Sequence, residues 1–216
     1  KGLHKAYDDG STRHDVLCGI DLELGAGEVV ALLGPSGSGK STLLNLIAGL
    51  DAPDQGIVEV AGRDLGTMSE RERTLMRRRE VGFVFQSFNL VPTLTVLENV
   101  QLPLELTGRR GAALRDEAAR LLSQVGLPER GSAFPDELSG GEQQRIAIAR
   151  ALAHSPALIL ADEPTGNLDS ATGARVLDLL TGLAAERGTA MLIATHSAEV
   201  VARADRVVTL RDGLLR

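Results

Sequence analysis

The sequence GPSGSGKST at Gly34–Thr42 directly follows an apolar run, VVALL, at Val29–Leu33. It fits the pattern G-x-x-x-x-G-K-[ST], which is typical of loops that bind the phosphates of nucleoside triphosphates. The apolar run predicts a buried strand, and the residues after the loop predict a helix that continues to about Leu50. Strand, glycine-rich loop and helix follow one another in the order that the pattern requires, so a chance glycine turn is the weaker interpretation.

The residues of this loop have distinct predicted roles. The glycines allow backbone N–H groups to turn toward phosphate oxygens, and the start of the helix adds partial positive charge. We expect Lys40 to contact the β- and γ-phosphates and Ser41 to give its hydroxyl to Mg²⁺. The predicted nucleotide-binding residues of the loop are Gly34, Pro35, Ser36, Gly37, Ser38, Gly39, Lys40, Ser41 and Thr42. The motif by itself does not separate a kinase, a GTPase and an ATPase.

Two acidic residues at the end of another apolar run favour hydrolysis. ALILADEP at Ala157–Pro164 places Asp162 at the end of a predicted buried strand, where the ligands of open α/β sheets bind. Asp162 can hold Mg²⁺ through water, and Glu163 projects in a different direction, toward an attacking water. A carboxylate in that place orients the water or accepts its proton. The alternative is a pair of solvated strand-end acids, which the preceding phosphate loop makes less favourable.

A histidine follows a further apolar run in the same manner. AMLIAT at Ala190–Thr195 predicts a strand, and His196 comes directly after it. A histidine at this edge of the sheet can donate a hydrogen bond to a γ-phosphate. The alternative is an ordinary loop histidine.

The chain alternates apolar strands and helices, which indicates a mostly parallel, covered sheet. Helical periodicity dominates from Thr95 to about Arg150, and we interpret it as an insertion between two parts of that sheet. The alternating run VLCGIDLELGAGE at Val16–Glu28 suggests a smaller antiparallel sheet. We therefore predict one α/β domain, residues 1–216, with a P-loop nucleoside triphosphatase core, a small antiparallel β-subdomain and an inserted all-helical lobe at about residues 95–150. The further predicted strands are 57–62, 81–85 and 206–213, and the further predicted helices are 71–79, 170–187 and 197–204.

Composition excludes several classes of protein. The formal net charge is −6 and the sequence has no long Lys/Arg block, which argues against a nucleic-acid partner. No run of 18 apolar residues is present, so we expect no membrane-spanning helix in this sequence. Cys18 is the single cysteine of the 216 residues, which excludes an internal disulfide and a cysteine-based zinc site.

A second glycine-containing helix start occurs in LSGGEQQR at Leu138–Arg145. It has the character of a phosphate-binding helix N-terminus, although the chain already contains one at Gly34–Thr42. Either two nucleotides bind to one chain, or one nucleotide is held by two copies of the chain. The residues alone leave both alternatives open.

Six motifs in order resemble those of the nucleotide-binding subunits of ABC transporters, along essentially the whole chain. They are GPSGSGKS, FVFQ ending at Gln86, LSGGEQQR, ILADEP, NLDS at Asn167–Ser170, and His196. Two longer segments, GFVFQSFNLVPTLTVLENVQLP and LADEPTGNLD, resemble the sequences of one branch of this family. That branch contains lipoprotein-releasing and macrolide-exporting ATPases. The resemblance implies an ATPase that uses ATP and Mg²⁺.

The resemblance also implies an answer to the question of the second loop. In this family two subunits face each other head to tail, and the phosphate loop of one and the LSGG segment of the other enclose one ATP. Ser139, Gly140 and Gly141 would then face the γ-phosphate of the partner's nucleotide. We expect Gly140 and Gly141 to make the closest approach, because a Cβ atom there would push the phosphate away.

Further roles follow from the resemblance. Tyr7 matches the aromatic residue that stacks on adenine, with an edge-strand tyrosine as the alternative. Gln86 would contact Mg²⁺ or water and report to the helical lobe, and Asp169 would couple the two nucleotide sites. Two positions depart from the family pattern: Glu142 stands where many relatives have Gln, and Ser197 stands where Asp is common. We expect the first to have a modest effect, and the second puts in doubt any support of His196 from that position.

Family resemblance implies an integral membrane permease on another chain, and a peripheral location on the cytoplasmic face of the bacterial inner membrane. ATP-driven closure would serve export, lipoprotein release or mechanical transmission, and the sequence does not choose among them. The alternatives are a soluble non-transport ABC ATPase and a P-loop kinase or regulatory module. The mixed-charge run RERTLMRRRE at Arg71–Glu80 is typical of a solvated helix face, with contact to a membrane partner or lipid headgroups as the alternative.

Overall fold

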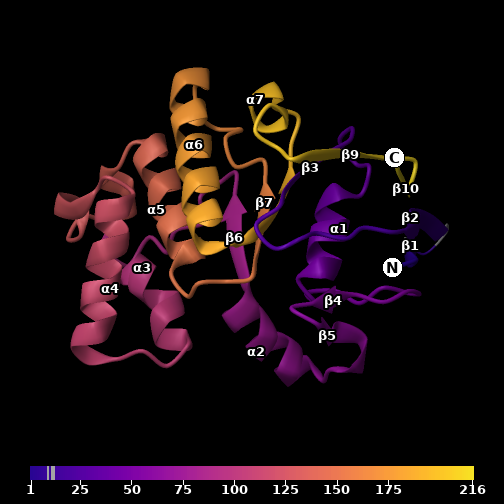
Figure 1. The fold of residues 1–216 in the computed structure, drawn as a ribbon, viewed down its shortest axis with the longest axis horizontal. Helices are drawn as coiled ribbons and strands as arrows, with labels where there is room; N and C mark the ends of the chain where they lie inside the picture. The colour runs from indigo at the N-terminus through magenta and orange to yellow at the C-terminus, as the bar shows by residue number, and fades with distance from the viewer. Residues whose placement is uncertain (9, 11–12) are drawn as a thin grey trace.

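The computed structural model describes residues 1–8, 10 and 13–216. In this part of the chain, six strands form the central sheet in the order β10-β9-β3-β8-β7-β6 (Figure 1). Neighbouring strands from β9 to β6 are parallel, and only the short β10 pairs antiparallel, with β9. The strands are β3 (Val29–Leu33), β6 (Val81–Phe85), β7 (Leu158–Asp162), β8 (Ala190–Ala194), β9 (Arg206–Arg211) and β10 (Leu214–Leu215).

Both faces of the sheet are covered, which is why its strands are apolar throughout rather than alternating. Along β3, Val29 and Ala31 pack into one core together with the helices of the inserted segment and α6 (Ser170–Arg187). Val30 and Leu32 point to the opposite face and pack with residues of α1 (Lys40–Ile47). The predicted mostly parallel sheet is therefore confirmed, and its two cores hold the strand ends in place from both sides.

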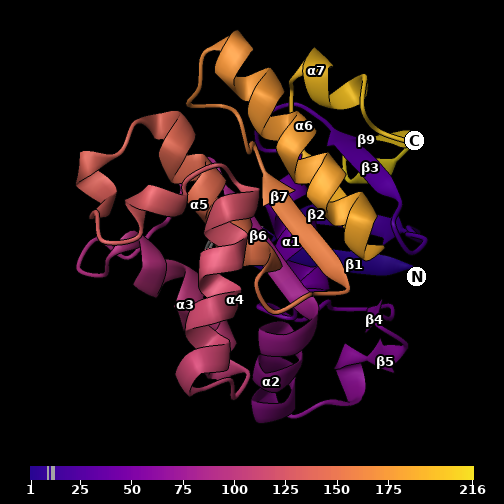
Figure 2. The same ribbon diagram turned by 60° about the vertical axis from the view of Figure 1, so that its left-hand side comes forward.

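Three longer helices lie between β6 and β7 in the sequence and form the left-hand side of the molecule in both views (Figures 1 and 2). Contacts join each of the three to the other two, and α5 also packs on β6 and α6. These helices and their connecting turns are α3 (Val96–Leu106), α4 (Gly111–Gln124), η2 (Pro128–Arg130), η3 (Pro135–Glu137) and α5 (Gly140–Leu152). Helices thus occupy the predicted segment, while its extent as a lobe of residues 95–150 stays a prediction.

The antiparallel elements are shorter than expected. β1 (Leu3–Asp8) pairs with β2 (Arg13–Ile20), and β4 (Glu59–Val60) pairs with β5 (Arg63–Asp64). The alternation of Val16–Glu28 predicted strand character beyond Ile20, but residues 21–28 form no strand. The chain turns within this segment, where the Glu28 side chain accepts a hydrogen bond from Gly25 N at 2.7 Å.

Two other predicted elements are also shorter in the structure. The predicted strand 57–62 is reduced to β4, and the predicted helix 197–204 is reduced to α7 (Ala198–Val201).

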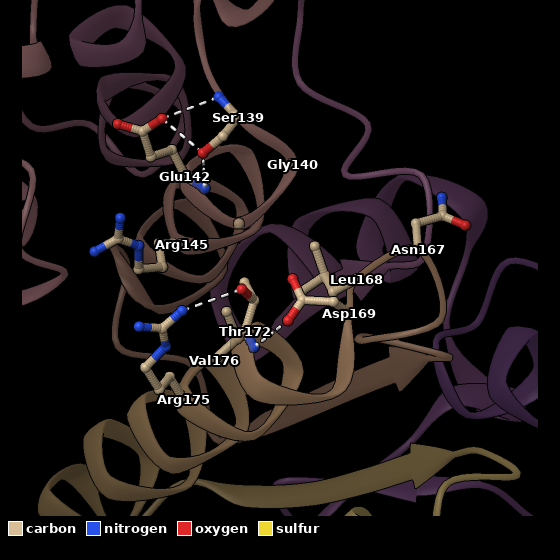
Figure 3. Close-up of a pocket in the computed structure, with 11 residues that line it drawn as sticks. Ser139, Gly140, Glu142, Arg145, Asn167, Leu168, Asp169, Thr172, Arg175 and Val176 are labelled. Atoms are coloured by element: carbon tan, nitrogen blue, oxygen red, sulfur yellow. Dashed lines mark hydrogen bonds between the residues drawn. The ribbon is translucent and has the colours of Figure 1, made fainter.

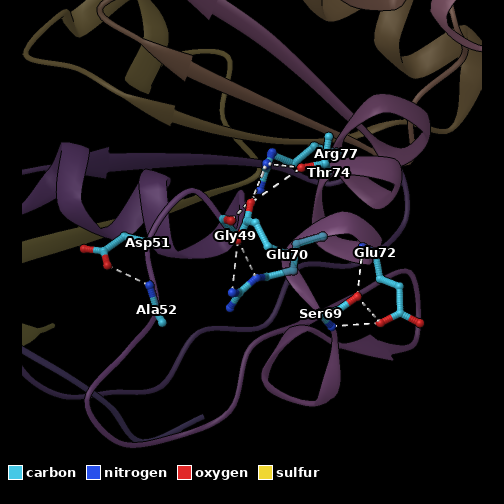
Figure 4. Close-up of polar contacts among 9 residues, drawn as sticks. Gly49, Asp51, Ala52, Ser69, Glu70, Glu72, Thr74 and Arg77 are labelled. Carbon is cyan, nitrogen blue, oxygen red and sulfur yellow. Dashed lines mark hydrogen bonds and ion pairs between the residues drawn. The ribbon is translucent and has the colours of Figure 1, made fainter.

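The mixed-charge helix α2 (Glu70–Glu80) follows the turn η1 (Leu65–Thr67) at the lower edge of the molecule (Figure 1). A capping box joins Ser69 and Glu72 at its start, and Glu70 forms ion pairs with Arg73 at 3.0 Å and Arg77 at 3.2 Å (Figure 4). Glu70 is exposed, but the Arg73 and Arg77 side chains are only 24% and 17% exposed. Arg77 also donates to the Gly49 carbonyl. These contacts join α2 to the segment after α1, and both interpretations of this run stay predictions. None of the helices in residues 1–8, 10 and 13–216 has both the length and the apolar character of a membrane span.

Candidate functional site

The phosphate loop lies between β3 and α1, at the carboxyl edge of the parallel sheet. Gly37 and Gly39 have φ of +78° and +99°, a backbone conformation that side chains with a Cβ rarely adopt. A Cβ atom on Gly39 would lie 2.8 Å from Val16 Cγ1, so this position has no room for one either. The backbone conformation therefore favours glycine at both positions, and at Gly39 the lack of space requires it as well.

Lys40 is buried, and its ammonium group lies against the backbone of the phosphate loop. Its Nζ donates to the carbonyl of Gly34 at 2.6 Å and to that of Pro35 at 3.1 Å, and lies 3.5 Å from His196 Nε2. The buried hydroxyl of Ser38 has no hydrogen-bond partner among the described residues. A buried polar atom left unpaired is unfavourable, and a phosphate oxygen would satisfy it. The loop thus fits the triphosphate that its sequence predicts.

Two of the three residues predicted to contact Mg²⁺ lie in contact with each other. Ser41 Oγ donates to Asp162 Oδ2 at 2.8 Å, so the helix start and the end of β7 present a hydroxyl and a carboxylate side by side. The described part of the chain contains no group of three or more acidic, histidine or cysteine side chains that could hold a metal ion without other ligands. Mg²⁺ sites of nucleotide-binding proteins use one or two protein ligands with water and phosphate oxygens, and this pair fits such a site.

Glu163 lies next to His196, as the strand ends predict. The distance from Glu163 Oε1 to His196 Nε2 is 3.5 Å, and Glu163 Oε2 accepts from Thr195 Oγ1 at 3.2 Å. Glu163 has a φ of +46°, which is strained for a residue with a side chain. Such strain persists where the surroundings fix it, and here the carboxylate is held by Thr195 and lies beside His196.

Ser197 supports this edge in a way the sequence did not indicate. Its backbone N donates to Thr195 Oγ1 at 2.9 Å, and its side chain caps α7. Thr195 is fully buried, so its hydroxyl accepts from one neighbour and donates to Glu163 in a fixed direction. Serine in place of the usual aspartate therefore serves as a helix cap here.

The side chain of Gln86 contacts the NLDS segment. Its Nε2 donates to Asn167 Oδ1 at 3.0 Å, and Asn167 Nδ2 donates to the Gln86 carbonyl at 3.0 Å. A Cβ on Gly166 would lie 2.8 Å from Gln86 Nε2, so the side-chain amide of Gln86 packs directly against Gly166. Contact between Gln86 and Mg²⁺ stays a prediction.

The second glycine-containing segment forms the start of α5 (Figure 3). Ser139 N and Oγ both donate to Glu142 Oε2, at 2.9 and 2.7 Å, and complete a capping box. The Ser139 hydroxyl and then its backbone N–H lower the pKa of the Glu142 carboxyl, with Arg130 adding to the effect. Glutamate at this position, the departure from the family pattern, thus suits the cap.

The structure gives Gly141 a second reason to be glycine. A Cβ there would lie 2.6 Å from Thr172 Cγ2 on α6, so the Thr172 side chain or one of the two helices would have to shift. A Cβ on Gly140 would lie 3.5 Å from Leu168 and Phe88, an ordinary contact. The expectation that both glycines serve approach to phosphate is therefore incomplete, because Gly141 is also required where α5 packs on α6.

A cavity of about 420 Å³ lies between the starts of α5 and α6 (Figure 3). Asp169 caps α6 by accepting from Thr172 N at 3.0 Å, and this hydrogen bond lowers the pKa of its carboxyl. The predicted coupling role of Asp169 stays a prediction. The lining residues are Ser139, Gly140, Gly141, Glu142, Arg145, Asn167, Leu168, Asp169, Thr172, Arg175 and Val176.

The predicted base-stacking residue, Tyr7, lies on β1 and is 44% exposed. Its hydroxyl donates to Asp51 Oδ2 at 2.8 Å. The ring is thus accessible to a ligand while its far end is tied to the segment that follows α1.

Arg150 is a further residue that the sequence did not single out. It projects from α5, and its guanidinium donates to the carbonyls of Asn89 at 2.6 Å and Phe88 at 3.0 Å. Phe88 and Asn89 both have positive φ, +59° and +51°, just after Gln86. Burial lowers the pKa of Arg150. Arg150 therefore holds a strained loop against the helix that begins at Ser139, and helical periodicity alone contained no signal for this contact.

Comparison with known proteins places these features in a family. The family described as ABC transporter matches residues 17–166. An uncharacterized ABC transporter ATP-binding protein of Mycobacterium tuberculosis is 56% identical over 215 residues, covering 99% of this chain and 86% of that protein. The lipoprotein-releasing system ATP-binding protein LolD of Legionella pneumophila is 47% identical over 213 residues, covering 99% of this chain and 94% of the relative.

Solved structures agree with the sequence matches and confirm the predicted fold class. The ATP-binding cassette MJ0796, a dimer in a post-hydrolysis state bound to ADP and Pi, has a TM-score of 0.91 and 42% identity to this chain. The match covers 100% of this chain and 95% of that chain. Likeness of this extent in both sequence and structure makes the chain a member of the ABC transporter family, as one of its ATP-binding, ATP-hydrolysing subunits.

Proposed function

We propose that two copies of this chain close head to tail around two ATP molecules, each copy completing the other's site. One observation carries the proposal. Ser139–Gly141 open a helix beside a cavity whose lining includes no residue of the phosphate loop Gly34–Thr42. A helix start of this kind has unpaired N–H groups and partial positive charge, so a second copy that brings its nucleotide there would use it. The dimeric state of MJ0796 supports this arrangement.

Within one copy, the residues at the edge of the sheet would bind the triphosphate. Lys40 would donate to phosphate oxygens instead of the carbonyls of Gly34 and Pro35, and Tyr7 would stack on the base. Ser41 and Asp162 would hold Mg²⁺, with Gln86 reaching the same place after release from Asn167. When bound, Mg²⁺ neutralises charge on the phosphate oxygens.

Glu163 would orient the attacking water and accept its proton, and His196 would donate to the γ-phosphate. Thr195 and the strained backbone of Glu163 support this assignment, because both fix the direction of the carboxylate before a ligand binds. From the partner copy, Ser139, Gly140 and Gly141 would contact the γ-phosphate, and Asp169 would join the two sites. Hydrolysis then depends on closure, and closure is a movement that can do work.

We further propose that the dimer drives an integral membrane permease on another chain, from the cytoplasmic face of the bacterial inner membrane. Full-length likeness to a lipoprotein-releasing system ATP-binding protein supports such a partner. Release of lipoprotein, export of another cargo and mechanical transmission across the membrane all fit the same ATPase. Its proposed site residues contact ATP, so they do not distinguish one cargo from another.

The mechanism is tested by Glu163→Gln, with Glu186→Gln on the exposed face of α6 as the matched control. We expect Glu163→Gln to retain ATP binding and to lower hydrolysis by about 10²–10⁴-fold, the range of a general base. Size-exclusion chromatography with light scattering should show an ATP-dependent dimer for this variant. Normal turnover in Glu163→Gln would remove Glu163 from its assigned role, and a monomer at saturating ATP would contradict the shared sites.

The membrane partner is tested by purifying the tagged chain from detergent-solubilised membranes of cells that express it at native level. We expect an integral membrane protein to co-purify in a stoichiometric ratio and to stimulate or regulate ATP hydrolysis. If only proteins without membrane spans co-purify, the chain acts instead as a non-transport ABC ATPase.

A further inference from the structure

Tyr7 belongs to a compact group of three side chains from two parts of the fold. Lys5 and Tyr7 lie two residues apart on β1, and Asp51 follows α1. Lys5 Nζ donates to Asp51 Oδ1 at 2.9 Å and to the Ala52 carbonyl at 2.8 Å. The Tyr7 hydroxyl donates to the other oxygen of the same carboxylate, Asp51 Oδ2, at 2.8 Å.

The carboxylate of Asp51 is the centre of the group. It also accepts from Ala52 N at 2.7 Å, which fixes its orientation on the chain (Figure 4). Burial opposes its charge, but hydrogen bonds from Lys5, Tyr7 and Ala52 outweigh burial and lower the pKa of Asp51. The Lys5 side chain is 11% exposed and the Asp51 side chain 34%, so the ammonium and the carboxylate form a half-buried pair. Such pairs keep their geometry better than exposed ones.

Lys5 also determines which face of the Tyr7 ring a ligand can use. Its Nζ lies over the ring, 5.1 Å from the ring centroid, in cation–π geometry. A flat base would therefore approach the opposite face. The ring has one end tied to Asp51 and one face against Lys5, while 44% of the residue is exposed.

The same tyrosine lies near the phosphate loop. The Thr42 hydroxyl acts on the Tyr7 hydroxyl in the direction that lowers its pKa, and Thr42 lies in the first turn of α1 beside Lys40 and Ser41. Burial and the contact with Asp51 raise the pKa of Tyr7, so its hydroxyl remains a proton donor at neutral pH. The ring is thus tied through Asp51 to the segment after α1, the helix whose first turn contains the residues that bind phosphates.

We propose that Lys5 and Asp51 are positioning residues that hold the Tyr7 ring as a preformed platform for the base of the nucleotide. The proposal rests on the proposed function, in which Tyr7 stacks on the base. A free tyrosine on the edge of a two-stranded sheet would lose rotamer freedom when a base binds, and prior ordering by Asp51 and Lys5 removes that loss. Neither residue need touch the nucleotide itself.

The experiment measures binding of MgATP and of magnesium tripolyphosphate, which has no base, to the purified chain by isothermal titration calorimetry. We expect Tyr7→Ala to weaken ATP binding by about 5- to 150-fold, the range of base–aromatic stacking. Tyr7→Phe, which keeps the ring, and Asp51→Ala should each weaken it by about 2- to 10-fold, the value of one hydrogen bond. Lys5→Met should act in the same direction, and Asp8→Asn on the same strand is the control.

Tyr7→Phe and Asp51→Ala remove the same hydrogen bond. The double variant should therefore bind ATP no more weakly than the single variant with the lower ATP affinity. Tripolyphosphate affinity should change less than about 2-fold in every variant, since its binding makes no use of the platform. An equal loss for ATP and tripolyphosphate would overturn the proposal, because it would show a general effect on the phosphate loop.

Two other results separate this proposal from the one on which it rests. If Tyr7→Ala weakens ATP binding but Asp51→Ala and Lys5→Met do not, Tyr7 is the base platform and the positioning role of its neighbours is wrong. If Tyr7→Ala leaves ATP affinity unchanged, the stacking role of Tyr7 fails first, and the positioning role fails with it.

Discussion

The phosphate loop and the start of α5 contain glycines for different physical reasons. In the loop, Gly37 and Gly39 have left-handed backbone conformations. In the helix start, Gly141 has an ordinary helical conformation and is small because Thr172 of α6 occupies the space of a side chain. A glycine-rich segment therefore indicates either a special backbone or a close approach, and the letters alone do not say which.

The two segments also differ in how complete they are. Around the loop, the helix start, the end of β7 and the end of β8 contribute side chains that already contact one another: Lys40 and His196 lie 3.5 Å apart, and Ser41 bonds Asp162. At the start of α5, Ser139 bonds the Glu142 of its own first turn. One surface is assembled by a single chain, and the other is ordered by its own cap and is the surface that we propose a second copy completes.

The largest expected effect separates these two surfaces. Lys40→Ala should weaken ATP binding to the isolated chain by about 10²–10³-fold, as for loss of a charged donor in a phosphate or oxyanion site. Ser139→Asn, which keeps a helix-capping side chain, should leave that affinity unchanged and lower only hydrolysis. Calorimetry and steady-state hydrolysis on both variants check this. Equal losses of ATP affinity would mean that Ser139 faces the nucleotide of its own chain.

The next effect is on stability. Gly141→Ala should lower the free energy of unfolding by about 1–3 kcal/mol, because its methyl group overlaps that of Thr172. Gly140→Ala is the matched control and should change stability by less than about 1 kcal/mol. Thr172→Ser removes the methyl group and should restore the stability of Gly141→Ala in urea unfolding.

The double variant Gly141→Ala/Thr172→Ser then isolates the role of Gly141 toward phosphate. If it regains both stability and hydrolysis, Gly141 serves helix packing alone. If stability returns and hydrolysis stays low, the methyl group also obstructs the partner's nucleotide.

A smaller effect tests whether the Glu163 carboxylate, beside the phosphate loop, is already oriented before the nucleotide binds. Thr195→Val keeps the shape of the side chain and removes its hydrogen bond to Glu163 together with the one it accepts from Ser197 N. We expect kcat to fall by about 2- to 10-fold with KM for ATP unchanged, the value of one hydrogen bond. Thr195→Ser should recover most of the loss. A rise in KM with constant kcat would show that Thr195 acts on binding and not on the carboxylate.

The smallest effect concerns the cap of α5. The pKa of Glu142 is lowered in the folded chain, so its stabilising contribution is present above the ordinary pKa of 4.5 and is lost as pH falls through the folded value. Glu142→Gln should lower stability by about 0.3–1 kcal/mol at pH 7, as for a charge at a helix N-terminus, and by less at pH 3.5. Urea unfolding of both proteins at the two pH values measures this difference. A constant difference across pH would mean that the carboxylate charge has no part in the cap.

Much of the loop side could be predicted because its signals are local. The strand–loop–helix order at Gly34–Thr42 and the acids that end β7 need only neighbours in sequence to be recognised. Thr195 and Arg150 were missed because their partners are 32 and more than 60 residues away. An apolar strand followed by a polar residue, or an arginine on a helix, is common in any α/β protein. Asn167 belonged to a recognised motif, yet its pairing with Gln86 across 81 residues had no local sign.

By itself, the sequence determined the family, the parallel sheet and the strand ends at which Lys40, Asp162, Glu163 and His196 would meet, because apolar periodicity and glycine spacing are properties of short segments. Tertiary structure alone decided that Gly141 packs on Thr172, that Thr195 directs Glu163, and that Lys5 and Asp51 hold Tyr7. These contacts depend on which elements the fold brings within a few ångströms of one another. The sequence lists the residues of each surface, and the packing of helices and strands selects the partner of each.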